Sequence, residues 1–164
     1  MTMYRALHVK RMKRIMKIIV DADACPGKQI IEKAAKENNI QVIMYCDISH
    51  TITSSYSEVR YVDKGFQSVD MALINVTENG DIIVTQDYGV AAMALGRKAY
   101  AISPKGYIYD NDNMDRLLFE RHISAKVRRS GGRTSNPKKR IKEDDERLYY
   151  NLLKLINTNL NKEI

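Results

Sequence analysis

The sequence predicts an α/β domain in which helices connect the strands of a mainly parallel sheet. Short apolar, β-branched runs at 18–20, 41–46 and 82–84 alternate with segments of helical periodicity. A helix between two such strands favours parallel pairing, because a parallel pair needs a crossover connection. A chain of 164 residues is long enough for one domain with a real core and short for two. We therefore expect a single domain.

The first part of the chain predicts two strands with a helix between them. Residues 1–15 lack periodicity and are expected to form a disordered basic extension. The strand at 18–20 is followed by Pro26, which we expect at the first position of a helix, since proline loses no hydrogen bond there. This helix is expected to end at Asn38, before the strand at 41–46.

The middle of the chain repeats this alternation. A segment rich in Ser and Thr is expected to be a loop over 48–57, followed by a short strand over 59–62. Apolar residues at helical spacing from Val69 predict a helix that ends near Asn79-Gly80, and the next strand and helix are expected at 82–84 and 88–95.

The last third combines a basic loop with a final amphipathic helix. The loop contains Gly-Gly and Pro without apolar periodicity. The final helix has an apolar stripe that could pack on the domain or on a second copy of the chain. The expected elements are strands at 98–102 and 107–109, a helix over 111–128, the loop over 129–142, the end of the domain at 156 and a tail over 157–164. The stripe consists of Leu148, Leu152, Leu155 and Ile156.

The composition is that of a globular protein and excludes a membrane-embedded class. The chain is 44% hydrophobic and 29% charged, and no apolar run approaches the roughly 20 residues of a membrane span. Cys25 and Cys46 form neither a disulfide framework nor a paired-cysteine metal motif, and the N-terminus lacks the apolar core of a signal peptide. We expect a cytoplasmic protein in which Cys25 is a buried structural residue.

The net charge of +7 is concentrated in two segments that contain bases and no acids. They hold fourteen of the 27 Lys and Arg residues, so the rest of the chain is net acidic. An acidic body with basic segments suits phosphate chemistry on a polyanion, although a solvated surface explains such segments equally well. The bases are Arg5, Lys10, Arg11, Lys13, Arg14 and Lys17 in the first segment, and Lys126, Arg128, Arg129, Arg133, Lys138, Lys139, Arg140 and Lys142 in the second.

Four aspartates are expected to gather at one edge of the sheet. Asp21, Asp23 and Asp87 lie at or just after the carboxyl ends of predicted strands, where open parallel sheets bind ligands. Asp70 could reach the same edge from the start of its helix. Convergent carboxylates suit one or two Mg²⁺ or Mn²⁺ ions, which activate water and stabilise the leaving oxygen of a phosphodiester. A turn or cap role explains Asp23 equally well, and Asp70 could be an exposed helix carboxylate.

Four stretches of the sequence resemble one protein family. They are KIIVDADACPG, GFQSVDMALI, IIVTQDYGVA and RRSGGRTSNP, and in this order they resemble the YaiI/YqxD family of bacterial proteins, in the PIN-like nuclease superfamily. The resemblance covers about residues 16–156 and implies a Rossmann-like three-layer α/β/α domain that hydrolyses RNA with bound metal. It implies catalytic roles for Asp21, Asp70 and Asp87, with Asp23 as an additional metal ligand.

Further residues are expected to support the carboxylates or to bind nucleic acid. Ser68 and Thr85 could donate hydrogen bonds to the acids, although helix capping explains both. In the basic loop, the two glycines would let backbone N–H groups approach a phosphate, and arginines would bind its oxygens. No aromatic residue interleaves with these bases, so we expect salt-sensitive binding with little sequence preference. The predicted contacts are Arg128, Arg129, Gly131, Gly132, Arg133, Lys138, Lys139 and Arg140.

Two alternatives to a Mg²⁺- or Mn²⁺-dependent ribonuclease stay open. One is an RNA-binding or ribosome-associated module whose carboxylates have no catalytic role. The other is a haloacid dehalogenase-like phosphatase, because an apolar strand followed by two acids one residue apart also describes that family. Its later acidic pair is poorly matched by Thr85-Gln86-Asp87. RNA is the expected partner, a membrane is not, and the C-terminal helix could join two copies.

Overall fold

The computed structural model describes residues 15–162, except residues 24, 64, 66, 135 and 137. The predicted N-terminal extension, apart from Ile15, lies outside the described residues. The strands are β1 (Lys17–Asp21), β2 (Gln41–Asp47), β3 (Glu58–Val62), β4 (Ile82–Val84), β5 (Tyr100–Ile102) and β6 (Ile108–Tyr109). The helices are α1 (Lys28–Glu37), α2 (Val69–Val76), α3 (Tyr88–Gly96), α4 (Asn111–Arg129) and α5 (Lys142–Lys162).

The strands form one sheet in the order β3-β2-β1-β4-β5-β6. Neighbouring strands pair in parallel except β6, which runs antiparallel to β5. The chain builds outward from β1 to β3, returns to the centre at β4 and then builds outward on the other side. Open α/β sheets bind ligands at the carboxyl ends of the strands beside such a reversal. The mainly parallel α/β fold predicted from the sequence is confirmed, and the reversal marks where a site is expected.

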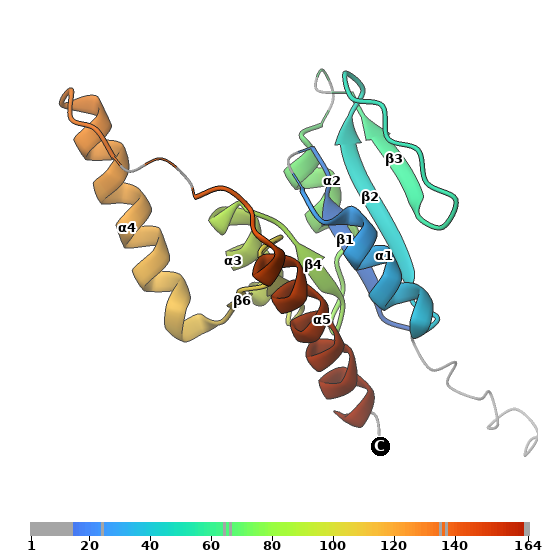
Figure 1. Cartoon of the computed structure of the whole chain (residues 1–164). Coiled ribbons are helices and arrows are strands. Elements are labelled where there is room, and N and C mark those ends of the chain that lie inside the picture. The colour runs from blue at the N-terminus through green and yellow to red at the C-terminus, as the bar shows by residue number, and fades with distance from the viewer. Residues whose placement is uncertain are drawn as a thin grey trace, which may run out of the picture.

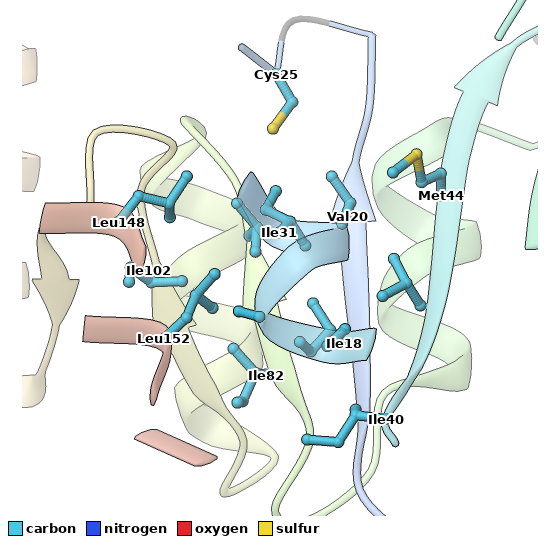
Figure 2. Packing of buried hydrophobic residues seen from close by; sticks show 14 of the residues in the cluster. Ile18, Val20, Cys25, Ile31, Ile40, Met44, Ile82, Ile102, Leu148 and Leu152 are labelled. Atoms are coloured by element: carbon cyan, nitrogen blue, oxygen red, sulfur yellow. The ribbon is translucent and has the colours of Figure 1, made fainter. Parts of the chain in front are cut away.

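Helices cover both faces of the sheet, so the domain has three layers (Figure 1). One face packs against α1 and α5, and Figure 2 shows Ile18 and Val20 of β1 in this core with Leu148 and Leu152 of α5. Ile19 belongs to the opposite core, with residues of α2 and α3. Successive residues of a strand point to opposite faces, which explains how one apolar run serves both cores.

The helix α4 departs from this layered arrangement. Its first turns pack on the core through Met114 and Leu117, and the rest of the helix projects from the body of the domain (Figure 1). Its central residues Phe119 and Ile123 are exposed, so the apolar side chains of this helix are only partly used for packing. No helix in the described part of the chain is both long and apolar enough to cross a membrane.

The C-terminal helix packs on its own domain. The apolar stripe predicted for it is buried against the sheet and α1, so packing within the chain uses the face that could have joined two copies. The helix is longer than predicted, because it begins at Lys142 and continues through Lys162. The prediction of a tail from residue 157 is wrong for 157–162, where Asn159 is buried and donates a hydrogen bond of 2.9 Å to the carbonyl of Gly80.

Two predicted boundaries are wrong because the backbone adopts left-handed conformations. Helix α1 begins at Lys28, two residues after Pro26, since Gly27 precedes the helix with a φ of 87°. A side chain on Gly27 would also collide with the guanidinium of Arg140. The strand predicted from Lys98 begins at Tyr100, because Lys98 has a φ of 59° and ends the turn after α3.

Candidate functional site

Asp21 lies at the carboxyl end of β1, beside the reversal of the strand order. Its Oδ2 accepts a hydrogen bond of 3.1 Å from the hydroxyl of Thr85, which follows β4. Burial is the main cause that raises the pKa of Asp21 to about 6, and the Thr85 bond opposes it. The charges of Asp70, Asp23 and Asp87 raise this pKa further. The structure therefore brings the other three predicted aspartates within electrostatic reach of Asp21.

Asp87 joins this site to the start of α3. Its Oδ1 accepts hydrogen bonds from the backbone N–H groups of Gly89, at 2.7 Å, and Val90, at 3.3 Å, so Asp87 caps the helix. The N–H of Asp87 donates to the hydroxyl oxygen of Thr85 at 3.0 Å. Thr85 therefore bridges Asp21 and Asp87, and it is fully buried. The support that the sequence predicted from Thr85 is present as this pair of hydrogen bonds.

Asp70 approaches the site from the first turn of α2. Burial and the charge of Asp87 raise its pKa above the usual value of a carboxyl group. Ser68 is the cap of the same helix, where its side-chain oxygen accepts a hydrogen bond of 3.2 Å from the N–H of Met71. The prediction that Ser68 supports the carboxylates is therefore corrected: Ser68 fixes the helix that carries Asp70.

Asp23 has a structural task at the end of the neighbouring strand. Its Oδ1 accepts a hydrogen bond of 2.9 Å from the N–H of Asp47 and lies 3.3 Å from Nδ1 of His50. This contact ties the turn after β1 to the end of β2, which is the turn role that the sequence left open. A part for Asp23 in metal binding stays a prediction.

The residues at this edge fit a hydrated cation better than a closed metal cage. Within the described ranges, no group of three or more His, Cys, Asp or Glu side chains is placed to hold a metal ion. Mg²⁺ keeps several waters and commonly takes one or two carboxylates together with substrate phosphates. Asp21 with Asp70 or Asp87 offers such a pair, and since burial first and like charge second raise the pKa of Asp21 and of Asp70, a bound cation would favour their ionised forms.

Cys25 contributes no nucleophile to the site. Its side chain is buried, and burial raises the pKa of its thiol to about 11. The expectation of a buried structural cysteine is confirmed.

Sequence reasoning missed Arg121 of α4 as a residue of the site. Its Nη1 lies 3.7 Å from Oδ1 of Asp87, and its side chain is about half exposed. A guanidinium at the rim of an acidic site can bind a phosphate oxygen, and here it marks the side from which α4 meets the aspartates.

The predicted basic loop begins at the far end of α4. Arg128 and Arg129 lie in the last turn of α4, and the exposed residues beyond this helix include Arg133, Lys138 and Lys139. We call these five residues the basic arm. Their exposure suits the predicted contact with a polyanion.

Gly131 and Gly132 have a different task from the predicted one. The N–H of Gly131 donates to the carbonyl of Arg128 at 3.2 Å, and the N–H of Gly132 donates to the carbonyl of Val127 at 3.0 Å. These bonds satisfy carbonyls at the end of α4, with Gly131 in the left-handed conformation at a φ of 84°. The expectation that both amides face a phosphate is corrected, because they are used to end the helix.

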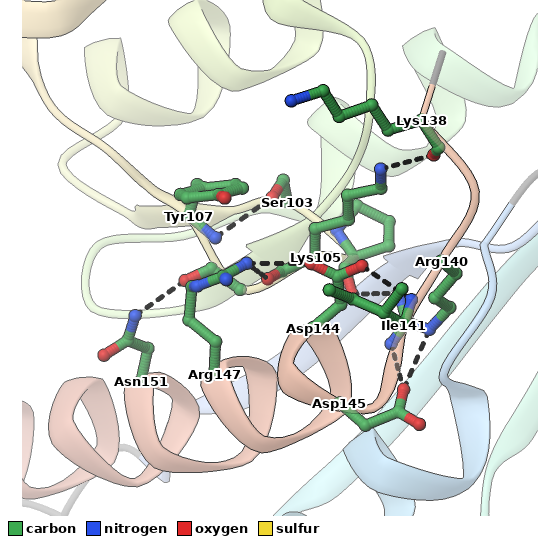
Figure 3. Close-up of polar contacts among 12 residues, drawn as sticks. Ser103, Lys105, Tyr107, Lys138, Arg140, Ile141, Asp144, Asp145, Arg147 and Asn151 are labelled. Carbon is green, nitrogen blue, oxygen red and sulfur yellow. Dashed lines mark hydrogen bonds and ion pairs between the residues drawn. The ribbon is translucent and has the colours of Figure 1, made fainter.

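Arg140 also differs from its prediction as a nucleic-acid contact. Its Nη1 donates to the carbonyl of Pro104 at 2.7 Å, and its Nε and Nη2 contact Oδ1 of Asp145 at 2.8 and 2.6 Å (Figure 3). The guanidinium thereby connects the segment before α5 with the loop between β5 and β6. The prediction of a nucleic-acid contact is corrected for Arg140, because its charge is compensated by Asp145 within the domain.

Comparison with known proteins finds one family across most of the chain. Residues 19–158 match the family described as "Uncharacterized BCR, YaiI/YqxD family". A UPF0178 protein of Clostridium tetani is 69% identical over 141 residues, which are 86% of this chain and 97% of the relative. A UPF0178 protein of Clostridium novyi is 73% identical over 142 residues, which are 87% of this chain and 95% of the relative.

A more distant similarity is found among solved structures. The crystal structure of Rae1 (YacP) from Bacillus subtilis is 18% identical and superposes with a TM-score of 0.41. The match covers 92% of this chain and 100% of the other.

Proposed function

The chain belongs to the YaiI/YqxD family, and we propose that it is a metal-dependent nuclease that hydrolyses phosphodiester bonds, with RNA as the substrate. One observation carries the proposal: Asp21 is half-buried at the reversal of the strand order, with its pKa raised to about 6 and three further aspartates in reach. Buried like charges in a cleft are costly to maintain, and perturbed carboxyls of this kind cluster at functional sites. A divalent cation would remove the repulsion.

Each acid has a distinct part in the proposed site. Asp21 and Asp70 are the first candidates for ligands of the cation, because Asp70 is the largest like-charge influence on Asp21. Thr85 holds Oδ2 of Asp21 and binds the N–H of Asp87, so the two acids keep a fixed relation. A bound Mg²⁺ or Mn²⁺ would activate water and neutralise charge on the phosphodiester.

Basic residues along α4 would hold the polyanion. Arg121 lies beside Asp87, and Arg129 follows eight residues later, which corresponds to about 12 Å along a helix. The basic arm then continues beyond the helix. A single strand bound along α4 would meet phosphate-binding groups from the acidic site to the end of the helix, and its affinity would fall steeply with salt.

A haloacid dehalogenase-like phosphatase fits the site less well. That chemistry needs a second acid, two residues after the first, that is available to move a proton. In this chain Asp23 occupies that position, and its Oδ1 is engaged by the N–H of Asp47. The non-catalytic RNA-binding module is the stronger alternative, since the described residues contain no preformed group of three metal-binding side chains.

A cleavage assay on labelled single-stranded RNA tests the proposal. Wild-type protein with Mn²⁺ should cut the RNA, and Asp21→Asn and Asp87→Asn should each lower the rate by about a hundredfold or more. Asparagine is an equally good helix cap, so Asp87→Asn removes charge while α3 keeps its start. Asp115→Asn on the exposed side of α4 is the matched control for loss of one charge.

Two outcomes would count against the nuclease. Equal cleavage by the wild type and both site variants would exclude this site. Salt-sensitive RNA binding without metal-dependent cleavage would favour the binding module, and circular dichroism of each variant would show whether it is folded.

A further inference from the structure

A cavity of about 510 Å³ lies beside the aspartates at the carboxyl edge of the sheet. Gln86 and Tyr88, which line it, flank Asp87 in the sequence, and Pro26 reaches it from the turn that follows Asp23. A cavity of about 790 Å³ lies elsewhere, at the amino ends of the strands around Gly80. The cavity of about 510 Å³ adjoins the proposed site, and the nuclease mechanism assigns it no task.

Tyrosine side chains form much of the wall of this cavity. Tyr88 and Tyr109 contact each other edge to face, with ring centroids 5.9 Å apart. The hydroxyl of Tyr109 donates to the carbonyl of Thr85 at 3.2 Å, so this wall is joined to the residue that holds Asp21. Tyr107 also lines the cavity and is 56% exposed, which leaves its ring accessible to a ligand.

Cations complete the lining, and no Asp or Glu is among the described lining residues. Lys105 comes from the loop between β5 and β6, and Arg116 from the exposed side of α4. Aromatic faces together with cations suit a flat heteroaromatic ring that carries a phosphate. A cavity of this size is within the usual range for small-molecule sites.

The loop that carries Tyr107 is fixed in place by α5 (Figure 3). Nη1 of Arg147 donates to the carbonyl of Lys105 at 3.0 Å, and Nδ2 of Asn151 donates to the carbonyl of Gly106 at 2.7 Å. The guanidinium of Arg147 also lies over the Tyr107 ring, 4.3 Å from its centroid. A wall held by so many contacts loses little freedom when a ligand binds, which favours affinity.

We propose that this cavity binds one unstacked nucleobase of a single-stranded polynucleotide, next to the phosphodiester at the aspartates. This inference rests on the proposed function, whose substrate it narrows to single strands. A base in a duplex is already paired and stacked, so it could enter only after unpairing. Stacking on tyrosine accepts every base, and Tyr88 and Tyr107 supply the aromatic contacts that the basic arm lacks, with the buried Tyr109 packed behind Tyr88.

Binding without catalysis tests the cavity directly. Asp21→Asn protein in EDTA is titrated with a labelled twelve-nucleotide RNA strand, with a fully abasic strand of the same length and charge, and with the RNA in a duplex. We expect the base-bearing single strand to bind about ten- to a hundredfold more tightly than the abasic strand. The duplex should bind less tightly than the single strand. Equal binding of the base-bearing and abasic strands would overturn the inference.

Variants assign the preference for bases to the cavity. Tyr107→Ala should abolish the difference between base-bearing and abasic strands, and Tyr107→Phe should keep it because the ring remains. Tyr150→Ala, at an exposed tyrosine of α5 outside the cavity, is the matched control and should also keep it. Arg116→Gln should weaken both strands alike, since it removes only a charge. Loss of the preference in Tyr150→Ala, or its full retention in Tyr107→Ala, would contradict the assignment.

A cross-linking experiment is independent of variants that could misfold. Light-induced coupling of a strand that contains 4-thiouridine should modify the peptide with residues 103–109 or 86–88 on wild-type protein. Coupling only to the basic arm would overturn the proposal that the cavity binds a base, and would leave the nuclease proposal in place. Tyr107-dependent, base-dependent binding by a protein that never cleaves RNA would refute the nuclease and retain the cavity as a base-binding site.

Discussion

Asp21 and Asp81 lie at opposite ends of the same pair of central strands, and the protein compensates their charges differently. Asp81 precedes β4 at the amino edge of the sheet, where its fully buried carboxylate accepts hydrogen bonds from the N–H of Lys17, at 3.1 Å, and that of Glu78, at 2.9 Å. Nζ of Lys17 lies 2.6 Å from its Oδ2. A cation and backbone donors therefore satisfy this acid.

Asp21 receives one hydroxyl donor and faces three other acids at the carboxyl edge. Its pKa is raised because burial and like charge outweigh the Thr85 hydrogen bond, and among the described residues no cation acts to lower it. The difference teaches that burial alone does not identify a functional acid. A paired buried acid joins two strands, and an unpaired one is available to an external cation or proton.

The largest effect is expected from breaking the paired acid. Asp81→Ala removes the acceptor of two backbone N–H groups and the nearer partner of the Lys17 ammonium, which keeps the half-exposed Glu78 carboxylate at 3.6 Å, so the free energy of unfolding should fall by about 3–5 kcal/mol. Urea unfolding followed by circular dichroism measures this. The double variant Asp81→Leu with Lys17→Met should recover most of the loss, because apolar replacement of both partners removes the uncompensated charge. A fall below about 1 kcal/mol in the single variant would break the comparison.

Neutralising Asp21 should raise the free energy of unfolding, in contrast to the loss of Asp81. A carboxyl whose pKa is raised to about 6 on folding costs stability once it ionises, and the full cost is present above that pH. The difference from the usual value corresponds to about 3 kcal/mol, and partial exposure reduces the expected gain to about 1–2 kcal/mol in Asp21→Asn at pH 7.5. Unfolding at pH 4.5, 6 and 7.5 should show the gain growing with pH. A constant difference would mean that the carboxyl does not titrate in this window.

The next largest effect is expected from a divalent cation, which should bind at Asp21 and stabilise the folded state. At a free Mn²⁺ concentration ten times its dissociation constant, binding to the folded state stabilises it by about 1.4 kcal/mol. Thermal unfolding should show this stabilisation in the wild-type protein and less than half of it in Asp21→Asn. Asp115→Asn is the matched control and should respond as the wild type does. An equal response of Asp21→Asn would place the cation elsewhere.

Much of the fold was predictable because local signals and tertiary packing agree. The apolar runs of β1, β2 and β4 and the helical spacing of α2 mark elements that the structure contains. The order of strands was not predictable, since it depends on which runs meet in space. The start of α1 was missed because Gly27 adopts a left-handed conformation and lies against Arg140, a residue more than a hundred positions later.

The candidate site was predictable in its acids and less so in its other residues. Asp21 and Asp87 were predicted because each follows an apolar strand. The parallel sheet then brings the ends of these two strands to the same edge. Arg121 was missed because its proximity to Asp87 depends on how α4 leaves the domain. Arg140 was misassigned because a run of bases does not show which guanidinium has an internal partner such as Asp145.

The smallest expected effect concerns the hydroxyl of Thr85, which donates a hydrogen bond to Asp21. Thr85→Val removes the hydroxyl that donates to Asp21 and accepts from the N–H of Asp87, and should cost about 1 kcal/mol of stability. The pKa of Asp21 should rise further, because this hydrogen bond lowers it. Carboxyl carbon titration by NMR measures that pKa, with Thr85→Ser as the variant that keeps the hydroxyl. If the pKa of Asp21 is unchanged in Thr85→Val, burial and like charges alone set that pKa. Asp21 and Asp81 would then differ because Lys17 lies beside Asp81, and not because of their hydrogen bonds.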